Sequence, residues 1–234
     1  MPPSSQAAVL AWLKDKKFTS VLDVPSGDGW LARGVKAQGQ GNEFDGIDLY
    51  EQPADGYRRI WKCDLNDGLP SECGTYDLVC CCEGIEHVGN PLLLFQAFKC
   101  CIRPDGHLVI TTPNVWYPQA RLQYLARGFF PSFPCLVGKI VHGSHMHIMP
   151  WNWPQLYLYL KLAGFDQIQI VTEPLSAAKH FYEKLLALPP RLYARRRARK
   201  ASTDEQRIFW ETAASDAALL GRHLIVTARP RLLK

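Results

Sequence analysis

The feature that most constrains this chain is an apolar strand that runs directly into a glycine-rich turn. Residues 21–24 read Val-Leu-Asp-Val, and a Gly-x-Gly turn at Gly27 and Gly29 follows before a helical stretch. Glycines permit a tight turn and let a ligand approach the backbone closely. A second strand at 46–49 contains Asp48, about twenty residues beyond the glycines, where a carboxylate can bind both ribose hydroxyls. The pattern predicts a pocket for a nucleotide cofactor.

An acid inside the first strand separates two classes of nucleotide cofactor. A dinucleotide-dependent dehydrogenase usually carries an apolar residue at the position of Asp23. S-adenosylmethionine instead brings an ammonium and a sulfonium group, which a carboxylate can hold directly or through water. Ala32 replaces the third glycine of a dehydrogenase fingerprint, but some dehydrogenases tolerate this change. The remaining interpretation is a strand, a turn and a partly exposed acid that caps the helix.

The stretch from Asp23 to Gly29, an acid followed by three residues and Gly-x-Gly, resembles the glycine motif of class I S-adenosylmethionine-dependent methyltransferases. The resemblance covers about residues 20–165, and it is closest to small methyltransferases of ubiquinone-type and sugar-type O-methylation. It implies S-adenosyl-L-methionine as the cofactor, with Asp64 reaching the adenine amino group and Leu65 supplying a backbone contact. The resemblance assigns cofactor binding to Asp23, Pro25, Gly27, Gly29, Asp48, Leu49, Asp64, Leu65, Cys82 and Glu83.

The later segments follow in the order that this resemblance implies. Glu83 and Glu86-His87-Val88 come after the fourth strand, similar to the family's strand-end acid and Glu-His-Val. We therefore expect the family's α/β fold, a Rossmann-like, seven-stranded and mostly parallel sheet in the order 3-2-1-4-5-7-6, with helices on both faces and the last strand antiparallel. The elements predicted after the second strand are strands at 61–65, 76–82, 108–112, 167–171 and 223–228, helices at 91–101 and 154–163, and a tight turn at 103–107.

Length and composition favour a single domain over residues 1–234. A chain with 47% hydrophobic residues can bury one sizeable core, and no apolar run reaches the roughly eighteen residues of a membrane span. Residues 1–5 carry no basic and then apolar signal, so we expect a cytoplasmic protein, and a leading helix is predicted at 7–17. Two insertions interrupt the fold, a substrate-side one at about 114–153 and a helical, basic one at about 175–221.

Eight cysteines raise the question of disulfides or a metal. None of them are spaced as Cys-x-x-Cys, and neighbouring residues of a strand such as Cys80, Cys81 and Cys82 point to opposite faces. We therefore expect reduced packing residues in a reducing compartment, and no metal site.

The first insertion is rich in aromatic residues and prolines. In methyltransferases of this fold an insertion at this position commonly forms part of the acceptor pocket or a lid that excludes water. Packing as a satellite core is the other interpretation, and the two can hold together. His145 and His147 stand at alternate positions, which share one face of an extended chain. They can be a base and its orienter or polar packing residues, whereas no third carboxylate or cysteine stands nearby in sequence to complete a metal site.

Methyl transfer from a sulfonium needs alignment more than acid catalysis. Holding the nucleophile, the methyl carbon and the sulfur in line can supply about 7–11 kcal/mol of the barrier. A hydroxyl acceptor must also lose a proton, which an imidazole can accept. The candidates for this base are His145, His147 and His87, the last because it follows the fourth strand. Glu83 could orient His87, line the methionine end of the cofactor, or be a solvated loop acid.

The second insertion carries the positive charge of the chain. Residues 191–234 hold eleven Lys and Arg against four Asp and Glu, a net charge of +7, whereas the remainder holds sixteen against eighteen, a net charge of −2. A helix is predicted at 177–188, and Pro189-Pro190 should end it. The cluster at 191–200 could make peripheral contact with an anionic membrane or form a solvated helix face. Nucleic acid is disfavoured because no RNA-binding module is recognisable.

These observations favour an enzyme that transfers a methyl group from S-adenosylmethionine to a hydroxyl of a sugar, a glycolipid or another small molecule. A glycan or lipid-linked acceptor is the favoured partner, and a quinone-type phenol comes next. The alternative is a non-catalytic S-adenosylmethionine-binding or scaffold protein of the same fold. A nicotinamide-dependent oxidoreductase fits less well, because it would have no use for Asp23.

Overall fold

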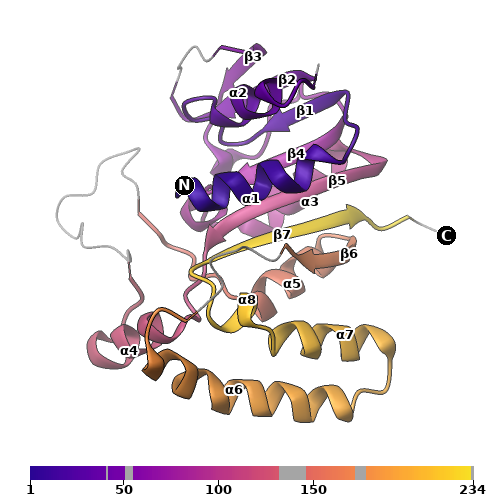
Figure 1. The fold of residues 1–234 in the computed structure, drawn as a ribbon. Helices are drawn as coiled ribbons and strands as arrows, with labels where there is room; N and C mark the ends of the chain where they lie inside the picture. The colour runs from indigo at the N-terminus through magenta and orange to yellow at the C-terminus, as the bar shows by residue number, and fades with distance from the viewer. Residues whose placement is uncertain (41, 51–54, 132–145, 172–177, 233–234) are drawn as a thin grey trace.

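The computed structural model describes residues 1–40, 42–50, 55–131, 146–171 and 178–232. Figure 1 shows a central sheet with helices packed against it and a pair of long helices, α6 and α7, in the lower part of the view. The elements in chain order are α1 Pro3–Lys14, β1 Ser20–Asp23, α2 Trp30–Ala37, β2 Glu43–Asp48, β3 Tyr57–Lys62, η1 Leu65–Asp67, β4 Tyr76–Cys82, η2 Ile85–His87, α3 Pro91–Cys101, β5 Ile102–Pro113, α4 Pro118–Arg127, α5 Trp153–Leu162, β6 Phe165–Ile170, α6 Phe181–Arg199, α7 Asp204–Ala213, α8 Asp216–Leu219 and β7 His223–Pro230.

The sheet has the predicted strand order, β3-β2-β1-β4-β5-β7-β6. β1 pairs in parallel with β2 on one side and with β4 on the other, whereas β7 runs antiparallel to both β5 and β6. The strand order reverses between β1 and β4, and in open α/β sheets such a reversal leaves a crevice beyond the carboxyl ends of the strands. The predicted fold class is confirmed, including the antiparallel last strand.

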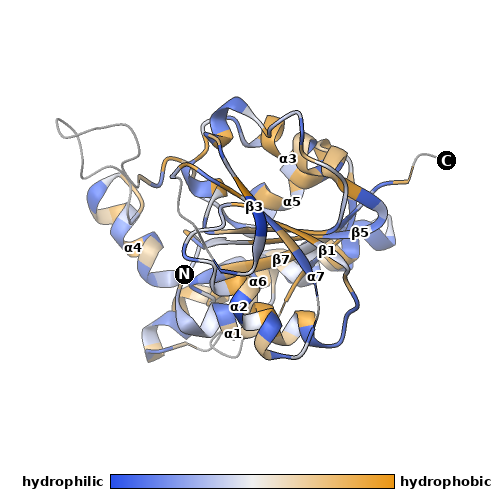
Figure 2. Cartoon of the chain, turned by 90° about the horizontal axis from the view of Figure 1, so that it is seen from above, coloured by the Kyte–Doolittle hydropathy of each residue, from blue (hydrophilic) through white to orange (hydrophobic). Residues whose placement is uncertain are grey.

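Two hydrophobic clusters hold the helices against the two faces of the sheet. On one face, Val9 of α1 and Leu31 of α2 pack with sheet residues such as Leu78. On the other face, Phe98 of α3 and Leu160 of α5 belong to a larger cluster. Figure 2 shows the largely apolar strands between these two helix layers. Both faces of the central strands are therefore buried, as is usual for parallel sheets.

The three consecutive cysteines of β4 divide between the two clusters, as the alternation of a strand predicts. Cys80 and Cys82 pack on the side of α1 and α2, and Cys81 packs on the opposite side. Burial raises the pKa of all three thiols well above the usual value, which disfavours the reactive thiolate. The seven described cysteines form no disulfide, and Cys135 lies outside the described residues.

Several boundaries differ from those that the sequence predicts; β2, for example, begins at Glu43 rather than at residue 46. β3 ends at Lys62 rather than including 63–65, because the side chain of Asp64 accepts a hydrogen bond from Asn66 N and caps η1. The segment 103–107 belongs to β5 instead of forming a tight turn, and the irregularity falls in its register with β4. α1 lies earlier than the predicted helix at 7–17, with a proline in its first turn.

The prediction that Pro189 and Pro190 end a helix is wrong, because α6 continues through both of them to Arg199. A proline inside a helix lacks the N–H that would bond to the carbonyl four residues earlier. Arg121 of α4 replaces one of these lost donors, since its Nη2 lies 3.1 Å from the carbonyl oxygen of Leu186. Within the described ranges, α6 included, no helix is long and apolar enough to cross a membrane.

A buried asparagine fixes the end of β5 against the loop that precedes β7. The Nδ2 of Asn114 donates to the carbonyl oxygens of Ala218 and Gly221 at 3.1 and 2.7 Å, and its Oδ1 accepts from Trp116 N at 2.9 Å. The residue is 1% exposed, so no water replaces these bonds. Because β5 ends where β7 begins, Asn114 positions the polar residues at this edge of both strands.

We expect Asn114→Ala to lower the free energy of unfolding by about 2–4 kcal/mol, because it leaves two carbonyls and one N–H unsatisfied in the interior. The matched control is Asn90→Ala, which removes the exposed N-cap of α3 and should cost about 1 kcal/mol. Urea unfolding of both variants measures the difference. Equal losses in the two variants would contradict the role given to Asn114.

Candidate functional site

The glycine turn after β1 closes onto a carboxylate at the end of β2. Gly27 and Gly29 have φ angles of 51° and 77°, a region that side chains of L-residues rarely adopt. Gly27 N donates to Asp48 Oδ2 at 2.8 Å, and Asp48 Oδ1 accepts from Tyr50 N at 3.0 Å. A Cβ atom added at Gly27 would meet no atom within 4 Å. The turn therefore presents open backbone next to the Asp48 carboxylate.

Asp23, at the end of β1, is fully buried, but only one of its two carboxyl oxygens has a hydrogen-bond partner among the described residues. The hydroxyl of Tyr57 donates to Asp23 Oδ2 at 2.5 Å, whereas Asp23 Oδ1 has no hydrogen-bond partner among the described residues. Burial raises the pKa of Asp23 well above its usual value, and the nearby charges of Asp48 and Asp28 add to this effect against the opposing hydrogen bond from Tyr57. No cationic side chain among the described residues pairs with this carboxyl group. It is not the partly exposed helix cap that the sequence also allowed.

The turn is held from the opposite side by the loop that follows β4. A Cβ atom at Gly84 would come within 2.6 Å of Pro25 Cδ and 3.1 Å of Cys81 Sγ, so the glycine permits this close approach. Gly46 of β2 approaches Ser26 in the same way, with a hypothetical Cβ 2.9 Å from that of the serine. The segment Pro25-Ser26 therefore lies between the loop after β4, which contacts Pro25, and β2, which contacts Ser26.

The residues expected at the adenine end lie in a network between β3 and the loop after β4. Asp64 Oδ1 accepts from both the N and the Nδ2 of Asn66, and Asn66 Oδ1 accepts from Gly89 N at 2.8 Å. Cys63 N donates to the carbonyl oxygen of Asp48 at 2.8 Å. Asp64 and the following Leu65 therefore stand at the same edge of the sheet as Asp48, where Asp64 also caps η1.

Glu83 follows β4 directly and has an unusual backbone conformation. Its φ of 54° is uncommon for a residue with a side chain and is typical of functional sites. Its Oε1 accepts from Thr111 Oγ1 at 3.0 Å, and its Oε2 lies 3.5 Å from His223 Nε2. Burial acts to raise the pKa of Glu83, but His223 and Thr111 outweigh it and lower the pKa. Glu83 is a fixed, ionised carboxylate rather than a solvated loop acid.

A second polar cluster joins η2 to the chain after the first insertion. His87 Nδ1 lies 2.7 Å from the carbonyl oxygen of Met146, and because a carbonyl only accepts, this bond assigns the proton of the neutral ring to Nδ1. The ring centroids of His87 and His147 are 5.0 Å apart, and the two rings have an interplanar angle of 78°. His87 Nε2 lies 3.9 Å from Glu86 Oε1, and the carbonyl oxygen of Glu86 accepts from Ile148 N at 2.8 Å.

Glu86 is buried in this cluster and holds a proton at neutral pH. Its Oε2 accepts from Thr112 Oγ1 at 3.0 Å, and its Oε1 has no hydrogen-bond partner within the part of the chain that the structure describes. Burial, followed by the charge of Glu83, raises the pKa of Glu86 to about 8. The cluster therefore contains a neutral carboxylic acid beside two imidazoles.

Glu86, His87 and His147 also form a set that could hold a metal ion, because their ligand atoms lie within 4.8 Å of one another. Two imidazoles and a carboxylate suit a transition metal such as Zn²⁺. The sequence argument against a metal considered only ligands near the histidines along the chain, whereas Glu86 comes from η2. The absence of a metal stays a prediction, with this set as its named alternative.

A cavity of about 310 Å³ opens beside the two polar clusters. Glu83, Glu86 and His147 contribute to its polar wall, together with Arg222 and His223 from the start of β7. The apolar wall includes Val115, Tyr117, Ala120, Phe130 and Met149. The cavity lies over the ends of β4, β5 and β7, whereas the glycine turn lies over β1 and β2, so Glu83 stands where the two regions meet.

Residues of the first insertion divide between the cavity and the core. Tyr117 and Phe130 line the cavity, so the acceptor-pocket interpretation stays a prediction for them. Trp151 and Trp153 are 0% and 1% exposed and belong to the main hydrophobic cluster, as expected for packing residues. His145 lies outside the described residues.

Sequence reasoning missed several polar residues of the site. Tyr57 falls before the strand that the pattern predicts, so no signal linked it to Asp23. Thr111 was recognised only as a strand residue, although its hydroxyl faces Glu83. His223 and Arg222 lie more than a hundred residues after Glu83 in the sequence, and only the strand order brings them to the cavity. The expected antiparallel last strand was the one available clue to His223.

Comparison with known families and curated proteins gives two kinds of match. A family model described as a methyltransferase domain matches residues 5–170. A ubiquinone biosynthesis O-methyltransferase of Vibrio campbellii is 30% identical over 104 residues, 40% of this chain and 43% of the relative. A protein of the same name from Dechloromonas aromatica is 33% identical over 107 residues, 40% of this chain and 44% of the relative. Each match spans less than half of the relative's own length.

Solved structures share the fold at low sequence identity. The 1,6-didemethyltoxoflavin-N1-methyltransferase of Burkholderia thailandensis, bound to S-adenosylhomocysteine, has a TM-score of 0.52 and 16% identity, covering 97% of this chain and 77% of that chain. A SAM-dependent methyltransferase of Archaeoglobus fulgidus has a TM-score of 0.52 and 19% identity, covering 96% of this chain and 94% of that chain.

We expect the free energy of unfolding of the metal-free protein to decrease as the pH rises from about 5 to 8, because folded Glu86, with its pKa raised to about 8, keeps a proton that the unfolded chain releases near its model value of 4.5. Glu86→Gln should remove about 2–4 kcal/mol of this pH dependence, since a shift of one pKa unit corresponds to about 1.4 kcal/mol. Urea titrations at several pH values in a chelating buffer measure the two slopes. Parallel curves for the two proteins would show that Glu86 ionises normally.

Proposed function

The chain belongs to the class I S-adenosylmethionine-dependent methyltransferases, and we propose that it transfers a methyl group from this cofactor to an acceptor oxygen. The observation that carries the proposal is the buried Asp23 carboxyl beside the open glycine turn, whose Oδ1 has no hydrogen-bond partner in the described part of the chain. The adjoining cavity, with His147 in its wall, supports a second substrate next to this corner.

The residues of the corner fit the cofactor. S-adenosylmethionine supplies an electrophilic methyl group on a cationic sulfur and carries an ammonium group. Asp23 would face these positive charges, while Asp48 would bind the ribose hydroxyls and Asp64 the adenine amino group. Pro25, Gly27 and Gly29 would shape the turn. We propose that Leu49, Leu65, Cys82 and Glu83 also contact the cofactor.

The acceptor side needs a group that removes a proton from a hydroxyl. We assign this role to His147, because it lines the cavity, and we assign to His87 and Glu86 the positioning of its ring. The neutral ring of His147 takes up the acceptor proton at a ring nitrogen as the oxygen becomes the nucleophile. The negative charge of Glu83, at the boundary of the two regions, favours the imidazolium that results.

The acceptor that we propose is a hydroxyl of a sugar, glycolipid or other small molecule. The apolar residues Tyr117, Phe130 and Met149 favour an acceptor with an apolar part over a free sugar. The curated relatives carry names that refer to O-methylation in ubiquinone biosynthesis, which supports oxygen as the nucleophile and keeps a quinone-type phenol among the candidates.

We expect Asp23→Asn to weaken the binding of S-adenosylhomocysteine at least tenfold, because the amide keeps the shape of the carboxyl group but loses the charge that faces the ammonium. The stability of the free protein should not fall, since the buried carboxyl has no positive partner among the described residues. Calorimetric titration and urea unfolding measure the two effects. Unchanged affinity would remove Asp23 from the cofactor site, and binding of NADH in preference would contradict the cofactor.

The methyl-transfer step is tested by the formation of S-adenosylhomocysteine from S-adenosylmethionine with catechol or 4-nitrophenyl glycosides as acceptor probes. We expect turnover with an oxygen acceptor, and we expect His147→Asn to reduce kcat by about 10²–10⁴-fold, the usual contribution of general base catalysis. The matched control is the same change at His180, the exposed N-cap of α6, where asparagine also caps well and activity should be unchanged.

The outcomes of this assay separate the alternatives. Transfer to amine or thiol probes alone would contradict the oxygen acceptor. Tight cofactor binding without transfer to any probe would favour a non-catalytic binding protein. Equal activity of the His147 variant and the wild type would remove His147 from the proton transfer.

A further inference from the structure

The outward face of α6 carries large apolar side chains that no described element covers. Phe181, Leu185, Leu188 and Leu192 are spaced by four, three and four residues, so they share one face of the helix. Their exposed fractions are 75%, 50%, 47% and 62%, far above those of core residues. We refer to these four residues as the α6 apolar stripe.

The opposite face of α6 is packed, which fixes the direction of the stripe. Ala187 and Ala194 are 1% and 3% exposed, and Ala187 packs with Leu219 and Leu220 at the end of α8. The ring of Trp210 on α7 lies 5.4 Å from the guanidinium carbon of Arg197. The stripe therefore faces outward as a property of the fold.

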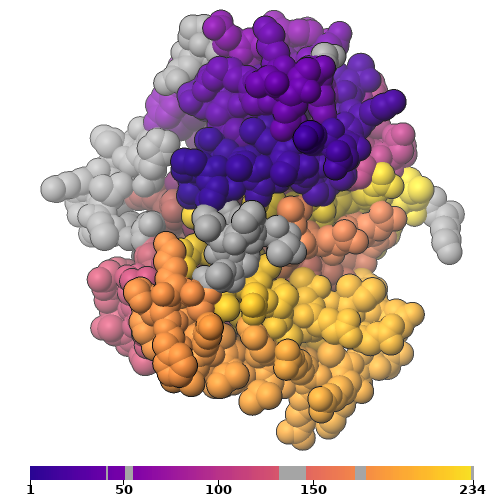
Figure 3. Space-filling view, viewed as in Figure 1, coloured from indigo at the N-terminus to yellow at the C-terminus, as the bar shows by residue number. Residues whose placement is uncertain are grey.

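α4, which contacts α6, exposes further apolar side chains. Leu125 and Leu122 of α4 are 83% and 41% exposed, and the bond from Arg121 Nη2 to the carbonyl oxygen of Leu186 joins α4 to α6. Figure 3 shows α4 in pink next to the orange start of α6 at one corner of the molecule. Monomers rarely expose a contiguous apolar surface without a use for it.

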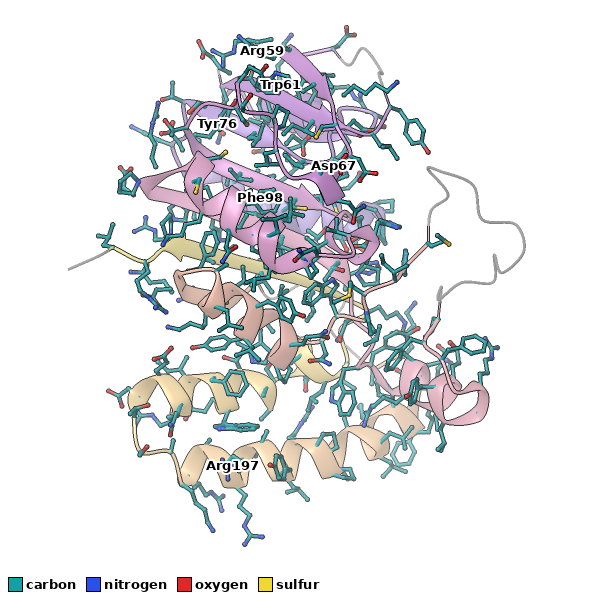
Figure 4. The ribbon with its side chains drawn as sticks, turned by 180° about the vertical axis from the view of Figure 1, so that it is seen from behind. Arg59, Trp61, Asp67, Tyr76, Phe98 and Arg197 are labelled. Carbon is teal, nitrogen blue, oxygen red and sulfur yellow. The ribbon has the colours of Figure 1, made fainter. Side chains whose placement is uncertain are left out.

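The second half of α6 adds positive charge to the same face. Arg195 and Arg199 follow Leu192 at helical spacing, and Arg196 and Lys200 lie beside them, all exposed. No ion pair joins these four side chains to another described residue, and the one acid of α6, Glu183, is buried and paired with Arg222 at 2.8 Å. In Figure 4, the label of Arg197 marks this end of α6, far from Arg59 and Trp61 on β3.

We propose that the α6 apolar stripe, Leu122, Leu125 and the basic end of α6 dock on an anionic phospholipid bilayer, with α6 lying in the plane of the interface. Apolar side chains next to a cluster of cations are the features of interfacial helices. Arginines at the membrane surface attract anionic headgroups. The surface proposed here is larger than the segment 191–200 that the sequence suggested, because it includes the first half of α6 and part of α4.

Two other occupants explain the surface less well. Nucleic acid would account for the arginines but not for the stripe. A second copy of the chain in a symmetric pair would bring the two basic ends of α6 into repulsion or leave them without partners. A bilayer can contact both halves of α6, the apolar stripe through its acyl chains and the basic end through its anionic headgroups.

The docking surface lies close to the acceptor cavity. Ala120 of α4 lines the cavity, whereas Leu122 and Leu125 of the same helix belong to the docking surface. If the proposed function holds, docking would place the cavity beside the lipid and would favour an acceptor that is carried on a lipid chain. The docking itself does not depend on the methyl transfer.

The test is sedimentation of the full chain with vesicles of phosphatidylcholine alone or with about a third phosphatidylglycerol. We expect strong binding to the anionic vesicles only, and a decrease when the salt concentration is raised. Leu188→Glu with Leu192→Glu should reduce the binding at least tenfold, as should Arg195→Ala with Arg196→Ala and Arg199→Ala. The matched control is Leu158→Glu with Leu162→Glu on α5, which are 55% and 61% exposed outside this surface and should leave binding unchanged.

Thermal unfolding of each variant checks that the fold is retained. No binding of the wild type to anionic vesicles would overturn the proposal. An equal loss of vesicle binding in the α5 control and in the α6 leucine variant would overturn it too. Dimers in light scattering that Leu188→Glu with Leu192→Glu converts to monomers would assign the surface to self-association instead. If the wild-type protein does not bind vesicles but binds a single-stranded RNA probe, the basic end of α6 would be assigned to nucleic-acid binding.

Discussion

The parallel pairing of the central strands is the constraint on which the whole site depends. β1, β2, β4 and β5 run in one direction, so their carboxyl ends meet along one edge of the sheet. Asp23, Asp48, Glu83 and Thr111 are far apart along the chain, and they converge only because each lies at or near such an end. β7 runs the opposite way, so its first residue, His223, reaches the same edge beside the end of β5. The antiparallel direction of β7 thus places His223 at the same edge of the sheet as the acidic residues of the parallel strands.

Sequence reasoning reached the fold because it leaves local signals, and it also led to a specific proposal for the cofactor site. The run from Asp23 to Gly29 combines a strand, a turn and an acid within a few residues, and the structure places them at one edge of the sheet. The residues proposed for the acceptor side leave no such signal, because they come from η2, from the end of β5 and from the start of β7. The interpretation of Pro189-Pro190 failed for a related reason. A proline ends an isolated helix, but in this helix a distant arginine on α4 replaces one of the two N–H donors that the prolines lack.

The two insertions serve the fold in different ways. The first is divided between the core and the cavity, so that Trp151 stabilises the sheet while Phe130 contributes to a binding surface. In the second, the helices α6, α7 and α8 pack against one another, α6 also contacts α4, and a few of their inner residues join the main core, where Phe209 of α7 stacks on Trp153 of α5. Figure 1 shows α6 and α7 below the sheet. The sequence of the second insertion is therefore constrained mostly on its inner side, where small residues such as Ala187 and Ala194 let the helices approach. Its outer side is free to carry a surface with a separate purpose.

The buried carboxyl of Asp23 has a consequence for the thermodynamics of ligand binding. Burial raises the pKa of this group well above its usual value, which favours the protonated form in the absence of a nearby positive charge. A cation that enters the corner makes the carboxylate the favoured form, so the proton is expelled as the ligand arrives. Binding is then an exchange of one positive charge for another, and its apparent enthalpy includes the ionisation of whichever buffer receives the proton. A neutral or anionic ligand of the same shape has nothing to exchange, so if Asp23 lines the cofactor site as proposed, this corner is expected to select ligands by charge before it selects them by shape.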